Sequence, residues 1–322
     1  MGGDGGARGR LGWPTALGLA AGIGLDAMAA DPRRGHPVSA FGVVAGRTER
    51  IAYRDSRLAG AAYAAALIGA TAATGRLLSG LTGPRSAGRA AVVCAATWAV
   101  LGGTTLRREA RGIQAALAAG DLESARAAVP RLCGRDPDGM DSAAIARAVV
   151  ESLAENTSDA VVAPLLWGAI GGVPGLLGYR AANTLDAMVG YRTPRYGRFG
   201  WAAARSDDVA NLVPARAAAL LAVLLAPVVG GDRQAAARVW RRDGGKHPSP
   251  NAGQVEAAFA GALGRTLGGP VSYAGRREER PLLGDGPAPD VTDIHRAVAL
   301  CAAVSAAAGF AAVALRASLD RR

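Results

Sequence analysis

Six apolar stretches, each with at most one charged residue, constrain the fold of this chain more than any other feature. They occupy residues 13–30, 59–81, 90–106, 160–179, 211–231 and 297–315. Each is close to the roughly 20 residues that an α-helix needs to cross a bilayer. The last is entirely uncharged. The pattern predicts an all-α fold, a polytopic integral membrane helical bundle whose cytoplasmic helical and loop regions carry the chemistry.

The composition fits a membrane protein and leaves one alternative. Hydrophobic residues make up 50% of the 322 residues and aromatic residues only 5%, so much of the apolar surface is alanine. Because alanine is a weak hydrophobe, a soluble alanine-rich helical protein is the competing interpretation. We expect a single membrane domain over residues 1–322, with the Gly- and Arg-rich residues 1–10 disordered.

The first apolar stretch also resembles a secretory signal. Arg8 and Arg10 precede it, and residues 27–29 are Ala-Met-Ala, which has small residues at the two outer positions, as at a cleavage site. Asp26 interrupts the run, however, and a polar motif follows immediately. These two features favour a retained first span.

The net charge of +11 would suit a nucleic-acid-binding protein, but the arginines are interleaved with acidic residues in loops and not with stacking aromatic residues. We therefore expect no nucleic-acid partner. Arginine-rich loops beside apolar spans mark the cytoplasmic side of a membrane. The loop between the first two spans carries six arginines and the next loop two, which predicts a cytoplasmic first loop. Cys94, Cys133 and Cys301 show neither disulfide nor metal-knuckle spacing.

Lys246 is the only lysine of a chain that otherwise uses arginine for every long basic side chain. A lysine ammonium is a compact point charge that can sit against a phosphate, whereas a guanidinium is a wide planar fork. Lys246 is followed by His247 and by the turn-forming residues Ser249 to Asn251, which lead into an expected helix. Backbone N–H groups at a helix start attract anions. This segment is a candidate phosphate-binding element, although it lacks the Walker spacing.

Three carboxylates, Glu151, Glu155 and Asp159, fall at helical spacing on one face. Like charges four residues apart destabilise a helix, so a positive group should compensate. Arg147 is one candidate, as a simple ion pair. The other is a divalent cation, since Mg²⁺ is usually held by one or two carboxylates together with substrate phosphates.

Three further polar patches border the apolar stretches. In the first, Asp26 and Asp31 precede His36, and an acid within a span is by default a functional candidate. The second and third patches place polar residues at helical spacing or side by side; they comprise Arg180, Asn183 and Asp186, and then Arg205, Asp207 and Asp208. Adjacent acids such as Asp207 and Asp208 most often mark a solvated helix start. The apolar run that flanks them makes that interpretation less suitable here.

Taken together, these motifs resemble the CobD/CbiB family of cobalamin biosynthesis. They occur in the family's order from Asp26 to about Asp285, and they are Asp31-Pro32-(x)₃-His36-Pro37-Val38, Glu151-(x)₃-Glu155-Asn156-(x)₂-Asp159, Asn183 to Tyr191, Ala204-Arg205-(x)-Asp207-Asp208-Val209 and Lys246-His247-(x)-Ser249-Pro250-Asn251-Ala252-Gly253. One departure is Ala30, where many members of the family have glycine; we expect it to be tolerated.

The resemblance implies a multi-pass enzyme of the cell (inner, cytoplasmic) membrane, an adenosylcobinamide-phosphate synthase with its active site facing the cytoplasm. Such an enzyme joins adenosylcobyric acid to aminopropanol phosphate through an amide, consuming ATP with Mg²⁺. A homo-oligomer or docking of pathway enzymes remains open. The roles implied are catalysis by Lys246, Asp243 and either His36 or His247, nucleotide binding by Arg180, Asn183, Arg205, Ser249 and Asn251, and metal binding by Glu151, Glu155, Asp159, Asp186, Asp207 and Asp208.

One site requires all these patches to reach one face of the membrane. If residues 160–179 and 211–231 both cross, residues 180–210 lie outside, away from ATP. Prolines in both stretches permit broken or re-entrant helices where protein or water lines them, so we expect at least one of the two not to cross fully. The alternatives are an intramembrane Mg²⁺-dependent prenyltransferase, from the Asp-rich patches, and a polytopic transporter, which would place more polar residues inside spans.

Overall fold

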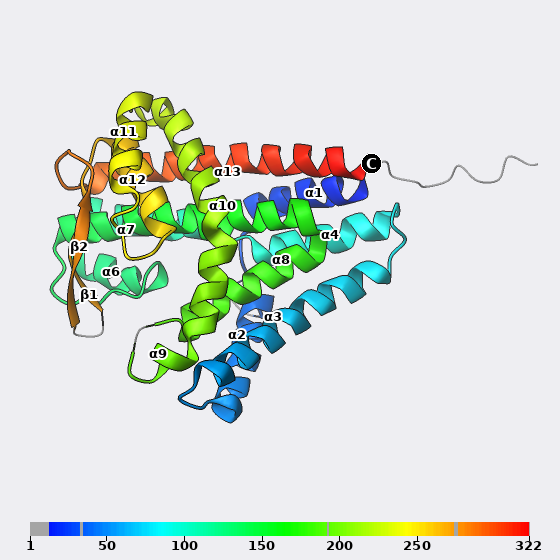
Figure 1. The fold of residues 1–322 in the computed structure, drawn as a ribbon. Helices are drawn as coiled ribbons and strands as arrows, with labels where there is room; N and C mark the ends of the chain where they lie inside the picture. Colours follow the sequence, from blue (N-terminus) through cyan, green and yellow to red (C-terminus); the bar gives the residue numbers. More distant parts are fainter. Residues whose placement is uncertain (1–12, 33–34, 192, 274–275, 322) are drawn as a thin grey trace, which may run out of the picture. The chain divides into compact units, whose positions relative to one another are not determined.

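The computed structural model describes residues 13–32, 35–191, 193–273 and 276–321. Residues 1–10, expected to be disordered, lie outside this part. The chain folds as two compact units that alternate along the sequence. Unit 1 comprises residues 1–101, 163–210 and 309–322, and unit 2 comprises residues 102–162 and 211–308. Nearly all of the ribbon is helical (Figure 1), which confirms the all-α prediction.

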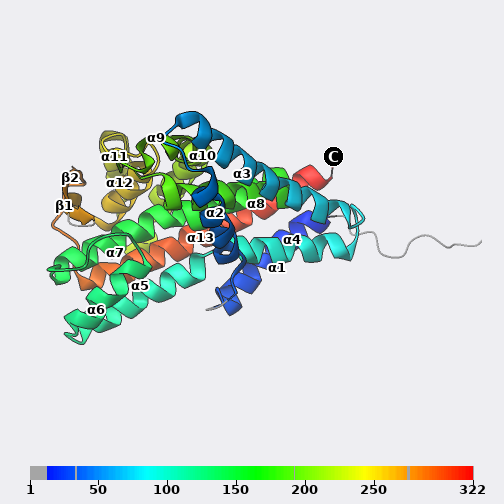
Figure 2. The same cartoon turned by 90° about the horizontal axis from the view of Figure 1, so that it is seen from below.

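Unit 1 is built from helices, most of them apolar. They are α1 (Pro14–Ala29), α2 (Pro37–Ala52), α3 (Arg57–Gly80), α4 (Ala87–Val100), α8 (Ala163–Val189), the short α9 (Tyr196–Phe199), the first part of α10 (Trp201–Leu225) and the end of α13 (Val291–Asp320). Helices α1 and α4 run side by side (Figure 2). A Cβ added at Gly18 or Gly22 would lie 2.6 Å or 2.4 Å from α4 atoms. Small residues four apart allow this close approach, as in membrane helix pairs.

Helix α8 turns back on itself at Gly172. The backbone there leaves helical geometry, with φ 60° and ψ −144°, two residues before Pro174. Beyond the turn, a Cβ at Gly175 would meet the Trp167 carbonyl at 2.2 Å. Trp167 donates from Nε1 to the Ala210 carbonyl (3.0 Å), and Asn183 donates to Asp207 (3.2 Å). Both ends of α8 therefore contact the same stretch of α10, the backbone path that a re-entrant segment requires.

Unit 2 surrounds the almost completely buried helix α12. Its elements are α5 (Gly103–Ala118), α6 (Leu122–Ala128), η1 (Val129–Arg131), α7 (Ser142–Thr157), the π-helical η2 (Ser158–Val162), the rest of α10, η3 (Ala226–Val229), α11 (Arg233–Asp243), α12 (Ala252–Leu263), β1 (Leu267–Tyr273), β2 (Arg276–Leu283) and most of α13. Aspartates cap helix starts in this unit: Asp141 accepts the Ala144 N–H and Asp232 the Ala235 N–H, both at 2.7 Å, and Asp121 accepts the Ser124 N–H at 3.0 Å. Every residue of α12 except Gln254 is buried.

The antiparallel hairpin β1–β2 was not predicted. Residues 267–275 read as a loop because glycines open the segment and the following residues are mainly charged, without apolar alternation. Its ends close on Leu267 and Leu283, which pair across the hairpin and are both fully buried. Burying that pair stabilises the hairpin by at most about 3–6 kcal/mol, which is about 1.5–3 kcal/mol for each side chain. A bulge between Leu267 and Gly269 shifts the register.

Five helical stretches among the described residues are long and apolar enough to cross a membrane: Arg57–Gly80, Ala87–Ala118, Ser142–Val189, Trp201–Val229 and Val291–Asp320. Helix α1 is a shorter apolar helix of 16 residues. These stretches support a multi-pass membrane protein. The predicted stretch 90–106 differs in detail, because α4 ends at Val100 and α5 begins at Gly103. The number of true crossings and the single-domain assignment stay predictions.

Ala30 follows α1 in a conformation that favours glycine, with φ 54° and ψ −164°. It is buried, and its carbonyl accepts the Nε1–H of Trp98 at 3.2 Å. A side chain in this region of backbone space costs about 1–3 kcal/mol. The chain tolerates the strain, which gives a physical reason for glycine at this position in the resembling family.

Candidate active site

The lysine loop, residues 243–251, is anchored by one buried carboxylate. Asp243 ends α11 and is inaccessible to solvent. Its oxygens accept from Lys246 Nζ (2.7 Å), from Arg242 Nε and Nη2 (2.8 and 2.6 Å) and from the Gly284 N–H (2.9 Å). The Arg242 guanidinium, followed by Lys246 and the Gly284 N–H, holds the pKa of the Asp243 carboxyl well below its usual range. Asp243 is therefore a permanently charged group that positions the half-exposed Lys246.

Helix α12 fixes the rest of the lysine loop. Gln254 donates to the Gly244 carbonyl (2.8 Å) and accepts from Trp240 Nε1 (2.9 Å). A Cβ at Gly253 would lie 2.4 Å from the Cβ of His247, so only glycine allows the loop to lie this close to the helix. The loop is held from two sides.

Ser249 and Asn251, both predicted to bind the nucleotide, have partners within unit 2. Ser249 Oγ accepts the N–H groups of Asn251 and Ala252 (3.3 and 3.2 Å), which satisfies donors at the start of α12. Asn251 is buried and accepts from Arg216 Nη1 at 3.3 Å. Their predicted role stays a prediction.

His247 faces an arginine. Its Nε2 lies 2.7 Å from Arg280 Nη1 on β2, and its Nδ1 accepts the Ser249 N–H at 3.0 Å. Burial, together with the positive charge of Arg280, lowers the pKa of His247 to about 4. The imidazole is therefore neutral near pH 7, and a permanent cation lies beside its Nε2.

The predicted carboxylate face of α7 is present. Glu151 is buried and forms an ion pair with Arg135, and its Oε1 accepts the Gly268 N–H of β1 at 2.6 Å. Of the two candidates, an ion pair with Arg147 and a divalent cation, the structure shows neither at Glu151, whose partner is Arg135. Arg147 donates to the Pro270 carbonyl at 2.8 Å. Glu155 is exposed on the same helix, and Asp159 lies in the π-helical turn that follows. Such turns are frequent at functional sites.

Glu256, on the buried helix α12, completes this group of charges. Burial, followed by the negative charges of Glu151 and Glu155, raises the pKa of Glu256 well above its ordinary value. Arg135 and Arg280 oppose this shift. A buried carboxyl whose proton affinity is raised by specific neighbours is a candidate acid or base.

The hairpin connects the two predicted patches of unit 2. The Gly268 N–H on β1 contacts Glu151 of α7, whereas Arg280 of β2 contacts His247. Just beyond β2, the Gly284 N–H contacts Asp243. The carboxylate face and the lysine loop, about a hundred positions apart in the sequence, therefore belong to one site.

A second cluster lies in unit 1, where α8 meets α10. Asn183 accepts from Arg180 Nη1 (3.3 Å) and donates to Asp207 Oδ1 (3.2 Å). One residue further along α10, Asp208 pairs with Arg205 at 3.1 Å. The polar patch that begins at Arg180 and the one that begins at Arg205 are thus one cluster. Its mixture of carboxylates and guanidinium groups suits a phosphate accompanied by a cation.

Asp186 and His36 are the remaining predicted site residues of unit 1. A Cβ at Gly190 would lie 1.8 Å from Asp186 Oδ1, so the Asp186 side chain folds over the end of α8. His36 Nε2 lies 3.4 Å from Asp31 Oδ1, and its Nδ1 accepts the Val38 N–H at the start of α2 (3.3 Å). His36 is held in a defined orientation beside a carboxylate, which suits a group that accepts a proton.

The metal-ligand prediction receives mixed support from geometry. Within the described ranges, no three His, Cys, Asp or Glu side chains form a group that could hold a metal ion. Both oxygens of Glu151 already accept from Arg135 and Gly268, so this residue fits poorly as a ligand. Asp207 and Asp208 supply the oxygen donors that Mg²⁺ prefers beside arginines that could hold phosphate. The individual ligands stay predictions.

Three charged residues of the unit 2 site were missed from the sequence: Arg135, Glu256 and Arg280. Arg135 lies in a Gly/Asp/Pro loop and Arg280 in a run of charged residues, and nothing in the sequence distinguishes either from the neighbouring arginines. Glu256 did carry a signal, because it is the one charged residue of an otherwise uncharged helix.

Comparisons with known proteins agree with the motifs. The family model described as "CobD/Cbib protein" matches residues 19–301. The "Cobalamin biosynthesis protein CobD" of Mycobacterium tuberculosis is 54% identical over 304 residues, covering 94% of this chain and 96% of the relative. Proteins of the same name from Chromobacterium violaceum and Rhodobacter capsulatus are 43% and 42% identical, covering 89% and 90% of this chain and 92% and 88% of the relatives. No solved structure matches the chain.

Proposed function

The chain belongs to the CobD/CbiB family, and on that premise we propose that it is an adenosylcobinamide-phosphate synthase of cobalamin biosynthesis. The reaction would join a carboxylate of adenosylcobyric acid to the amine of aminopropanol phosphate, with ATP as the energy source. The observation that carries the proposal is the joining of the lysine loop and the α7 carboxylate face by the β1–β2 hairpin. That arrangement offers cations for phosphates next to a carboxyl that can take up a proton.

The proposed chemistry has two steps. A carboxylate oxygen of the corrinoid attacks the γ-phosphorus of ATP, and the bond from that phosphorus to the bridging oxygen breaks to release ADP. The amine then attacks the acyl phosphate carbon, the carbon–oxygen bond to phosphate breaks, and the nitrogen loses a proton. Phosphoryl transfer of this kind depends mainly on positioning and charge neutralisation, so no protein nucleophile is required.

Lys246 is the proposed phosphate-binding cation. Its ammonium is half exposed, and Asp243 fixes it from the buried side. A fixed charge loses less entropy when it binds a ligand and needs no rearrangement as charge develops. In this assignment Asp243 positions Lys246 and does not exchange protons, because it accepts from Lys246, Arg242 and the Gly284 N–H at once.

Glu256 is the unit 2 group best suited to accept the amine proton. Its raised pKa gives it a proton affinity that a surface carboxylate lacks, and a general base works best when its pKa lies near the operating pH. His247, with a pKa of about 4 and Arg280 at its Nε2, is less suited. His36 in unit 1 stays the alternative base.

In unit 1, Arg180 and Arg205 are the proposed phosphate contacts, and Asp207 and Asp208 the residues that would hold Mg²⁺. When bound, Mg²⁺ neutralises charge on the phosphate oxygens. The turn in α8 supports this role: if α8 enters and leaves a membrane on one side, Asn183 and Asp207 return to the side from which α8 began. We propose that this is the cytoplasmic side of the cell membrane, where ATP is available.

Mass spectrometry of reaction products tests the function. Detergent-solubilised protein would be incubated with adenosylcobyric acid, aminopropanol phosphate, ATP and Mg²⁺, with and without each component. We expect an ATP-dependent amide adduct, lost in Lys246→Ala and kept in Arg241→Ala, which removes an exposed cation of the same segment. Folded wild-type protein that forms no adduct with either aminopropanol phosphate or ethanolamine phosphate would refute the synthase assignment.

A further inference from the structure

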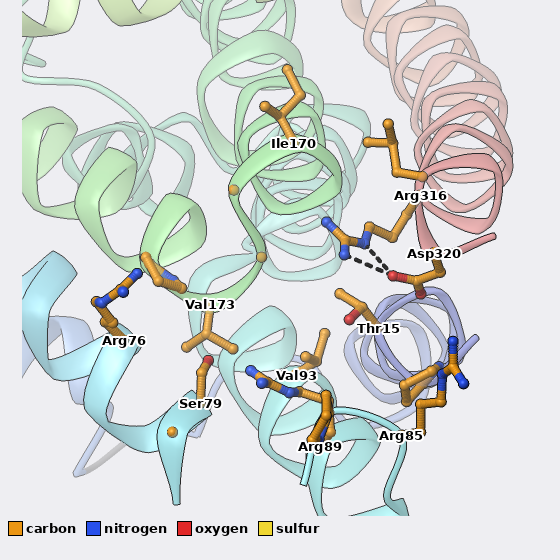
Figure 3. A pocket seen from close by; sticks show the side chains of 17 residues that line it. Thr15, Arg76, Ser79, Arg85, Arg89, Val93, Ile170, Val173, Arg316 and Asp320 are labelled. Carbon is orange, nitrogen blue, oxygen red and sulfur yellow. Dashed lines mark hydrogen bonds and ion pairs between the residues drawn. The ribbon is translucent and has the colours of Figure 1, made fainter. Parts of the chain in front are cut away.

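A large cavity in unit 1 lies apart from all the residues assigned above. Its volume is about 720 Å³, and it lies where α1 and α4 begin, where α3 and α13 end, and beneath the Gly172 turn of α8 (Figure 3). Cavities of about 300–1,000 Å³ are typical of small-molecule sites. None of the family motifs quoted above contributes to its lining.

Arginines dominate the lining of the cavity. Arg76, Arg85 and Arg89 form no ion pair with any other residue in the described part of the chain. The fourth arginine, Arg316, is paired with Asp320 at 2.7 Å. Asp320 is the only acidic residue of the lining and also accepts the Ala16 N–H at 3.3 Å. The cavity therefore has an excess of positive charge that the described residues do not neutralise.

An unsatisfied hydroxyl points to the same ligand chemistry. Ser79 is only 8% exposed, and within the described residues its Oγ has no hydrogen-bond partner. Figure 3 shows Ser79 and Arg89 directed toward the space beneath Val173. Burying a polar group without a partner is unfavourable, so such groups are usually satisfied by a ligand or water. An anion with oxygen acceptors would satisfy Ser79 and neutralise the arginines together.

The surroundings of the cavity are apolar. Ile170 lines the cavity and is 54% exposed. Leu77 and Leu81 directly follow the lining residues Arg76 and Gly80 in the sequence, and they are 64% and 75% exposed. The cavity also sits at the ends of the candidate spans Arg57–Gly80 and Val291–Asp320, the depth at which lipid headgroups lie. A ligand that combines a phosphate with acyl chains matches both the charged lining and the apolar rim.

We propose that this cavity binds the phosphate headgroup of an anionic phospholipid. The phosphate oxygens would accept from Arg76, Arg89 and Ser79, and the acyl chains would lie along the exposed leucines. A basic side chain near an anionic lipid contributes about 1 kcal/mol, which is about fivefold in affinity. The proposal does not depend on the enzymatic reaction.

Native mass spectrometry of the full chain in detergent, titrated with phosphatidylglycerol, tests the proposal. Phosphatidylcholine with the same acyl chains and inorganic phosphate are the comparison ligands. We expect phosphatidylglycerol to bind the wild-type protein, and about 25-fold more weakly when Arg76→Gln and Arg89→Gln are combined. Ser79→Ala, which removes only one hydroxyl, should weaken binding several-fold. The matched control is Arg47→Gln with Arg50→Gln, two exposed arginines on α2 of the same unit.

Each other outcome overturns the assignment. Equal binding of phosphatidylglycerol to the wild type and to the Arg76→Gln, Arg89→Gln protein would remove the cavity as the lipid site. Equal binding of phosphatidylcholine would show that the anionic charge is not recognised. Inorganic phosphate that binds as tightly as phosphatidylglycerol would identify a soluble anion, not a lipid, as the ligand.

Discussion

Replacing Asp243 with Asn should destabilise unit 2 although it changes the side-chain shape very little. One carboxylate oxygen accepts from Arg242 Nε and Lys246, and the other from Arg242 Nη2 and the Gly284 N–H. Whichever oxygen becomes an amide NH₂ then faces two donors.

The magnitude follows from the contacts. Each hydrogen bond to a charged group contributes about 1.5–3 kcal/mol, so losing two would cost about 3–6 kcal/mol. Arg242 and Lys246 are 49% and 48% exposed and can turn toward water, which recovers part of that cost. We therefore expect the free energy of unfolding to fall by about 2–4 kcal/mol.

Asp285→Asn is the matched control. Asp285 pairs with the same Arg242 at 2.8 Å but is 67% exposed, and exposed ion pairs contribute about 0–1 kcal/mol. Denaturant unfolding in detergent micelles, followed by circular dichroism, would measure both variants. Equal losses in the two variants, or a loss below about 0.5 kcal/mol for Asp243→Asn, would refute the anchoring role.

Three further predictions concern other parts of the chain. The gain in stability of Glu256→Gln over the wild type should be larger at pH 8 than at pH 5. Folding raises the pKa of Glu256, so the wild type loses stability as the pH rises. Melting temperatures of the two proteins that change in parallel with pH would contradict this. Ala30→Gly should raise the free energy of unfolding by about 0.5–2 kcal/mol, the strain relieved at φ 54° less the entropy cost of glycine; thermal unfolding would show a destabilised variant if the strain is absent. Gly253→Ala should lower the rate of amide formation at least tenfold without changing the helical circular dichroism. The new Cβ would displace His247, and a displacement of about 1 Å can cost 10²-fold in rate. Unchanged turnover would show that the position of the lysine loop is unimportant.

Much of the helical architecture was predictable, because apolar stretches of about 20 residues are recognisable in the sequence as helices that could cross a membrane. The predicted stretch 59–81 matches α3, and 297–315 falls inside α13. The reversal of α8 was harder, because the sequence offered only Pro164 and Pro174 as breakers. The turn itself is made by Gly172, one of several glycines in that stretch that look equivalent in the sequence.

The residues of the site were predicted patch by patch, whereas the contacts that join the patches were not predicted. The motifs located Lys246, Glu151 and Asp207, because those positions carry unusual residue types for their surroundings. The sequence could not show that Arg135 neutralises Glu151 or that Asp243 is inaccessible, since both depend on the unpredicted hairpin and on packing around α12. Local spacing along a helix is readable, whereas contacts between distant segments must come from the structure.

Isotope transfer tests the central claim, ATP-dependent activation of a carboxylate, most directly. Adenosylcobyric acid labelled with ¹⁸O in its reactive carboxylate would be converted by the wild-type protein, and the released inorganic phosphate analysed by mass spectrometry. The account predicts that each amide formed transfers one ¹⁸O atom to phosphate, with ADP as the other product. Amide formation without label in phosphate, or with label in AMP, would contradict it.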